Sequence, residues 1–118
     1  MKKPTNCKFI ESMYDMMNYL GKMEKGSKDK ALKAKYKEQY TLVRDMAQIY
    51  RITCYNFPQT HTEEYLMILK NKIGEQENLV DEGLQKLSID NTDNSDLMEA
   101  RIRLDTYYEI LNTYVLAI

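Results

Sequence analysis

The most reactive side chains in this chain are two cysteines and a single histidine. Cys7, Cys54 and His61 could together offer three soft ligands to a metal ion, or His61 could serve as a general base. No CxxC or HxxxH spacing accompanies them. The sequence therefore favours free cysteines that pack as small apolar side chains and a histidine exposed at a helix start. No metal, cofactor or disulfide is expected.

A second group of side chains that could bind a metal or act as acid and base is a set of carboxylates, Glu75, Glu77, Asp81 and Glu82. Glu77 and Asp81 are one helical turn apart and share a face. A di-iron bundle needs inward-facing Glu-x-x-His pairs, and the chain contains none. GxGxxG, P-loop and GxSxG motifs are also absent. The pattern predicts a solvated acidic face, and neither an enzyme nor a small-molecule substrate is expected.

Charge is distributed unevenly, although the net charge is only −1. Residues 1–59 carry 12 basic and 6 acidic side chains, whereas residues 60–118 carry 5 and 12. The basic charge is densest in residues 22–37, whose lysine strip consists of Lys28, Lys30, Lys33, Lys35 and Lys37. Three interpretations stay open: internal pairing with acidic helices, contact with a nucleic-acid backbone, or head-to-tail assembly of copies. The isoelectric point of about 5.9 and the scarcity of arginine argue against nucleic acid.

Apolar side chains recur at three- and four-residue spacing almost throughout, which predicts helices. Ser27 is a candidate N-cap, Pro58 ends the second segment, and Thr60 with Glu63 fits a capping box. Gly74 and Gly83 both lie inside the third segment, where they indicate close contact between helices, a mild local weakness or a functional kink. The expected helices span residues 6–21, 27–56, 60–88 and 95–118.

These segments predict a single all-α domain over residues 1–118. Short turns favour a four-helix up-down-up-down bundle, closed within one chain or completed by oligomerisation. The alternative is a long antiparallel hairpin of the second and third segments that other chains complete. No apolar run reaches the length of a signal peptide core or a membrane span, so we expect a cytoplasmic protein in a bacterial or host cell. The composition is typical of phage, mobile-element and accessory proteins.

Up-down topology brings four apolar segment ends to one pole of such a bundle. The chain ends on ILNTYVLAI, nine residues without a charge, and the end of the second segment is nearly as apolar. Either these ends cover each other, or they bind a partner protein or a second copy. The expected contact residues are Tyr50, Tyr55, Phe57, Tyr114 and Ile118. The predicted function is therefore a non-enzymatic protein-interaction module or assembly subunit, with a nucleic-acid-binding subunit as the alternative.

Overall fold

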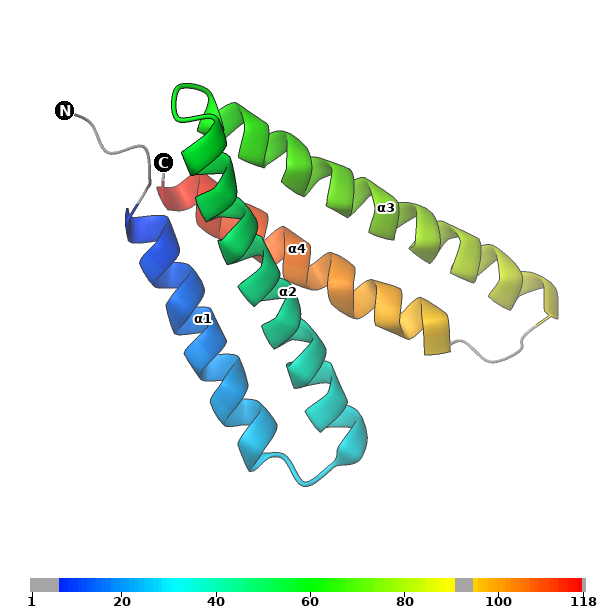
Figure 1. Cartoon of the computed structure of the whole chain (residues 1–118). Coiled ribbons are helices and arrows are strands. Elements are labelled where there is room, and N and C mark those ends of the chain that lie inside the picture. Colours follow the sequence, from blue (N-terminus) through cyan, green and yellow to red (C-terminus); the bar gives the residue numbers. More distant parts are fainter. Residues whose placement is uncertain (1–6, 91–94, 118) are drawn as a thin grey trace.

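The computed structural model describes residues 7–90 and 95–117, and these residues form four helices. They are α1 (Cys7–Gly26), α2 (Lys30–Asn56), α3 (His61–Asp90) and α4 (Ser95–Ala117). Successive helices run in opposite directions, and no strand occurs in the described ranges (Figure 1). The predicted all-α class and the four-helix, up-down-up-down order are confirmed. The expected first residue of the first helix, Asn6, and the expected last residue of the fourth, Ile118, lie outside the described residues.

In the turn between α1 and α2, the residue that caps the start of α2 differs from the prediction. The Ser27 hydroxyl donates to the Met23 carbonyl at 2.7 Å and so closes the end of α1. Asp29 caps α2 instead, because its Oδ1 accepts from the Ala31 amide at 3.0 Å. The α2 helix therefore begins three residues later than expected. An ionised carboxylate at this position also faces the positive end of the helix dipole.

The turn between α2 and α3 is held by backbone bonds. The Phe57 amide donates to the Thr53 carbonyl at 2.8 Å, and the Glu64 amide donates to the Thr60 carbonyl at 3.0 Å. His61 Nδ1 lies 3.3 Å from the Pro58 carbonyl oxygen. In this described turn, the helix start rests on these contacts rather than on the side-chain bonds of a capping box.

The two glycines inside α3 have different surroundings. A Cβ added to Gly83 would lie 3.0 Å from Leu97 Cβ and Cδ1, so glycine permits a close approach of α3 and α4. A Cβ added to Gly74 would meet no atom within 4 Å. The close-contact interpretation is thus confirmed at Gly83 and wrong at Gly74.

The most extensive helix packing joins α1 to α2 and α3 to α4, which gives two hairpins. The α2 helix also packs against α3 and α4, and α1 reaches α4. Buried side chains from all four helices form one hydrophobic cluster. The alternative fold, a hairpin of the second and third segments that other chains complete, is therefore wrong, because α1 and α4 of the same chain pack against it.

The hairpins share a pole and then diverge (Figure 1). The start of α1, the turn between α2 and α3 and the end of α4 meet at this pole, whereas the opposite ends of the hairpins lie far apart. The principal extents are 58 × 33 × 21 Å and the Cα radius of gyration is 16.1 Å. A compact chain of this length is expected to have a radius near ~13–14 Å. The four helices thus form a bundle at the pole, and the molecule opens into a V beyond it (Figure 1).

Candidate functional site

Four aromatic rings, one from each helix, fill the interior of the pole. This aromatic cluster consists of Phe9, Tyr50, Tyr65 and Tyr114, all with 0% exposure. Phe9 lies edge-on to Tyr50 and Tyr114, with ring centroids 5.0 and 4.8 Å apart. Tyr65 contacts the Tyr50 and Tyr114 rings at 5.0 Å each. Edge-to-face pairs of this kind add to the energy of area burial, so the cluster locks the four helices together.

The Tyr65 hydroxyl is satisfied inside this cluster. It donates to the Met46 carbonyl oxygen at 3.0 Å. Burial, with the neighbouring Tyr114, Tyr50 and Cys54 as smaller contributions, raises the pKa of Tyr65 well above its ordinary value. A neutral tyrosine that donates to backbone has a structural role, because it offers no acid or base near neutral pH.

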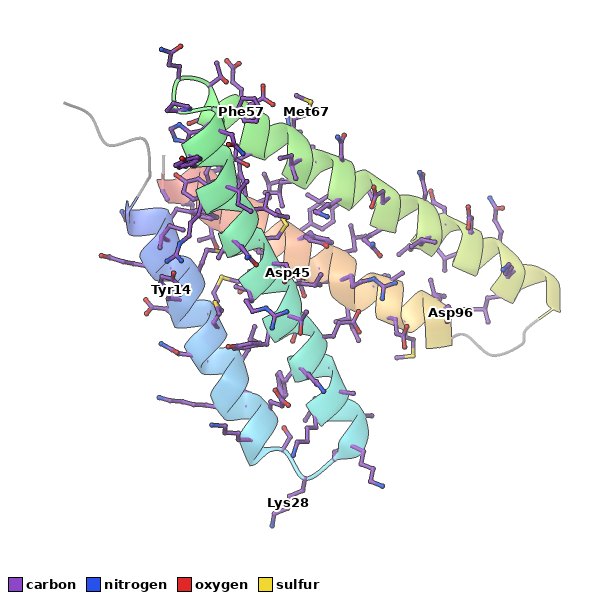
Figure 2. All side chains as sticks on the ribbon, viewed as in Figure 1. Tyr14, Lys28, Asp45, Phe57, Met67 and Asp96 are labelled. Carbon is purple, nitrogen blue, oxygen red and sulfur yellow. The ribbon has the colours of Figure 1, made fainter. Side chains whose placement is uncertain are left out.

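The surface of the same pole carries large apolar side chains that remain in solvent. Tyr55 is 86% exposed, Leu116 is 75% exposed and Phe57 is 48% exposed. Together with Ile52 and Val115, each about half exposed, they form the set that we call the exposed pole residues. Each belongs to the last two turns of α2, its C-cap or the last turn of α4. Figure 2 shows Phe57 at this end of the molecule.

The predicted contact residues thus separate into three groups. Tyr55 and Phe57 are exposed, as a contact surface requires. Tyr50 and Tyr114 instead lie in the core, because they complete the aromatic cluster from α2 and α4. Ile118 lies outside the described residues. The apolar ends cover each other on the inside of the pole, as the first interpretation expects, and a second layer of apolar side chains lies in solvent. Binding of a partner or a second copy stays a prediction.

Sequence reasoning missed Tyr65, although its spacing could have identified it. Tyr65, Leu69 and Ile73 follow one another at four-residue steps, and all three are buried. This step places side chains on one helical face. Leu66, the apolar residue that follows Tyr65, is only partly buried.

Of the two cysteines and the histidine considered as metal ligands, the structure describes the side chains of Cys54 and His61. Cys54 is a free, buried thiol, and burial raises its pKa despite a hydrogen bond from Tyr50. A thiol of raised pKa is a poor nucleophile and a poor metal ligand. The side chain of Cys7 lies outside the described part of the chain. Among the residues that the structure describes, no group of three or more His, Cys, Asp or Glu side chains is placed to hold a metal ion.

The lysine strip lies at the other end of the α1–α2 hairpin. All five of its side chains are exposed, and Figure 2 shows Lys28 at the tip of the hairpin. Within residues 7–90 and 95–117, no ion pair joins a lysine of the strip to a carboxylate. The first interpretation of the uneven charge was internal pairing of basic and acidic helices. The described part of the chain shows no such pairing for these lysines.

A polar junction forms where the two hairpins begin to diverge. Arg103 Nη1 on α4 lies 2.8 Å from Glu38 Oε1 on α2, and Arg103 Nε donates to Gln76 Oε1 on α3 at 2.9 Å. Gln39 Nε2 donates to Thr106 Oγ1 at 3.2 Å nearby. One guanidinium therefore links three helices through charge-assisted bonds, which are stronger than neutral ones.

A cleft of about 470 Å³ lies beside this junction, between the α1–α2 hairpin and α4. Its walls include Tyr19 and Leu20 from α1, Lys35 and Tyr36 from α2, and Glu109 from α4. The volume falls within the range of small-molecule sites, but the lining combines exposed charges with aromatic rings. Its buried polar residue, Thr106, already bonds to Gln39 and to the Ile102 carbonyl. We therefore regard the cleft as the inner end of the opening between the hairpins.

Comparison with known proteins finds no family model, no curated protein and no solved structure that matches the chain. Among the described helices, none is both long enough and apolar enough to cross a membrane. The functional argument therefore rests on the surfaces of this chain itself.

Proposed function

We propose that the chain is a non-enzymatic helical interaction module, or a small assembly subunit, that binds a partner protein or a second copy through its apolar pole. The observation that carries this proposal is the exposure of the pole residues, above all Tyr55 and Leu116. Tyrosine and large aliphatic side chains are enriched at the centres of protein interfaces. We place the protein in the cytoplasm, as an accessory protein.

Energetics support a contact role for this surface. Each large apolar side chain that a partner removes from water contributes about 1.5–3 kcal/mol when it is fully buried. The core cannot provide that cover, since the aromatic cluster already fills the interior of the pole. The exposed pole residues therefore gain by association and gain nothing more from folding.

Replacement of Tyr55 and Leu116 by serine tests the proposal without disturbing the core, because both side chains are mostly exposed. Tyr19→Ser is the matched control, since Tyr19 is 59% exposed on α1 and away from the pole. The chain is tagged, and the proteins that it retains from its native cell, including a differently tagged second copy, are quantified by mass spectrometry. We expect at least one protein to be retained by the wild type and the control and lost with the pole variant. Identical sets from all three would contradict the proposal.

A second candidate function rests on the lysine strip, whose five side chains are exposed and unpaired within the described chain. A strip of this kind could neutralise phosphates of a nucleic acid and release counterions. Binding of an oligonucleotide should then weaken steeply with salt, and replacement of the five lysines by glutamate should abolish it. Unchanged binding by the glutamate variant would eliminate this candidate.

A further inference from the structure

The two diverging hairpins end in arms of opposite charge. The basic arm, residues 20–40, carries seven lysines and three carboxylates. The acidic arm, residues 75–90 and 95–105, carries eight carboxylates and three basic side chains. Figure 2 shows Lys28 at the tip of the one and Asp96 on the other, on opposite sides of the opening between them. Opposite charges therefore face solvent on two separate arms of one molecule.

The chain is held in a form that keeps these arms apart. At the pole, the aromatic cluster joins the four helices. At the junction, Arg103 of the acidic arm pairs with Glu38 of the basic arm. This is the one ion pair between the arms among the described residues, and it joins a basic side chain of the mainly acidic arm to an acidic side chain of the mainly basic arm. Among the described residues, no strip lysine pairs with a carboxylate, although the acidic arm carries an excess of carboxylates.

Each arm is also an incomplete layer of two helices. The apolar face of α2 continues from the buried Val43 through the partly buried Tyr36 to Leu32, which is exposed. The acidic arm exposes Leu84 and Met98. Two packed helices bury one face against each other and need a further layer to bury the rest. A pair of helices with the opposite charge is the layer that fits each arm.

We propose that this layer is a second copy of the chain, with the basic arm of each copy packed against the acidic arm of the other. A two-fold axis makes the two contacts equivalent, so the assembly closes at a dimer. Each contact completes a four-helix bundle from two hairpins of different copies. The argument for a second copy is charge complementarity, because one chain supplies both surfaces. This surface is distinct from the apolar pole and goes beyond the function proposed for it.

Charge exchange tests the proposal with folded proteins, since all the positions are exposed. One variant carries Lys30→Glu, Lys33→Glu and Lys35→Glu, and a second carries Asp81→Lys, Glu82→Lys and Glu99→Lys. The mass of each is measured by light scattering across a concentration series at low and high salt, with helicity checked by circular dichroism. We expect the wild type to dimerise at low salt and each variant alone to bind itself at least tenfold more weakly. An equimolar mixture should restore a dimer, because each arm then again meets its opposite charge, and high salt should dissociate it.

Three outcomes would overturn the proposal: a wild type that stays monomeric at low salt, a dimer indifferent to charge reversal, or a mixture that does not restore association. A monomeric wild type that still binds an oligonucleotide through the strip would assign these lysines to nucleic acid. The pole variant separates this proposal from the proposed function. Loss of a partner with Tyr55→Ser and Leu116→Ser, together with failure of the charge exchange, would leave the pole proposal intact and remove only the paired arms.

Discussion

Truncation of Tyr114 to alanine should destabilise the fold severely, whereas the same change at Tyr55 should leave stability unchanged. Tyr114 is fully buried, and its ring contacts Phe9, Tyr50 and Tyr65 at centroid distances of 4.8, 5.8 and 5.0 Å. Loss of a large buried aromatic ring costs about 3–5 kcal/mol, because the transfer energy is lost and a cavity remains. A domain is typically stable by ~5–15 kcal/mol, so this loss is a large share of the total.

Urea denaturation followed by circular dichroism measures the free energy of unfolding of both variants against the wild type. At Tyr55, which is 86% exposed, we expect a change within about 0.5 kcal/mol. A loss below ~1 kcal/mol at Tyr114, or equal losses at the two positions, would refute the account of the pole as a buried aromatic cluster with an exposed apolar surface. For the same reason, a chain shortened to Glu109 should not fold, because it lacks Ile110 and Tyr114 from the core.

Three further predictions follow from the helix contacts and the buried hydroxyl. Gly74→Ala should stabilise the chain by up to ~1 kcal/mol through helix propensity, whereas Gly83→Ala should destabilise it because the added Cβ crowds α4; thermal melts compare the pair. Arg103→Met should cost roughly 1–3 kcal/mol in urea denaturation, since two charge-assisted bonds between helices are lost; a cost near zero would show that the junction contributes little. The raised pKa of Tyr65 gives stability that is complete below about pH 10, the unfolded value, and falls by about 1.4 kcal/mol per pH unit above it. Tyr65→Phe should flatten that alkaline decline, and an equally steep decline would contradict the burial of the hydroxyl.

The helices and their order could be predicted from the sequence because apolar spacing and turn residues are local signals. The predicted helix ends were less accurate where two neighbouring residues could each serve as a cap. Ser27 and Asp29 both suit an N-cap, and the structure uses Ser27 to end α1 and Asp29 to begin α2. A choice between neighbouring caps depends on the direction of the incoming chain, which a local pattern does not contain.

The pole could be located from the sequence, but its inner and outer layers could not be separated. Tyr50 and Tyr55 lie five residues apart on one apolar segment, yet the first is buried and the second is mostly exposed. Only the position of α1 and α4 around α2 decides which face is covered. The Arg103 junction was missed for the same reason, since its partners are 27 and 65 residues away in the sequence.

The divergence of the hairpins was not predictable from helix lengths and turns. Those features indicate which helices are antiparallel neighbours, and a closed bundle satisfies them equally well. The angle between the hairpins depends on packing at the pole and on the junction. It determines whether the lysines meet the acidic helices in the same chain.

A photo-crosslink from the position of Tyr55 tests the central claim, contact through the apolar pole, most directly. A photoreactive phenylalanine analogue replaces Tyr55 in one version and Gln48, an exposed polar residue of α2, in the other. Both are irradiated in the native cell, and the adducts are identified by mass spectrometry. The account predicts that a protein, either a partner or a second copy, crosslinks to position 55. The same protein should not crosslink to position 48. No adduct at position 55, or the same adducts at both positions, would contradict it.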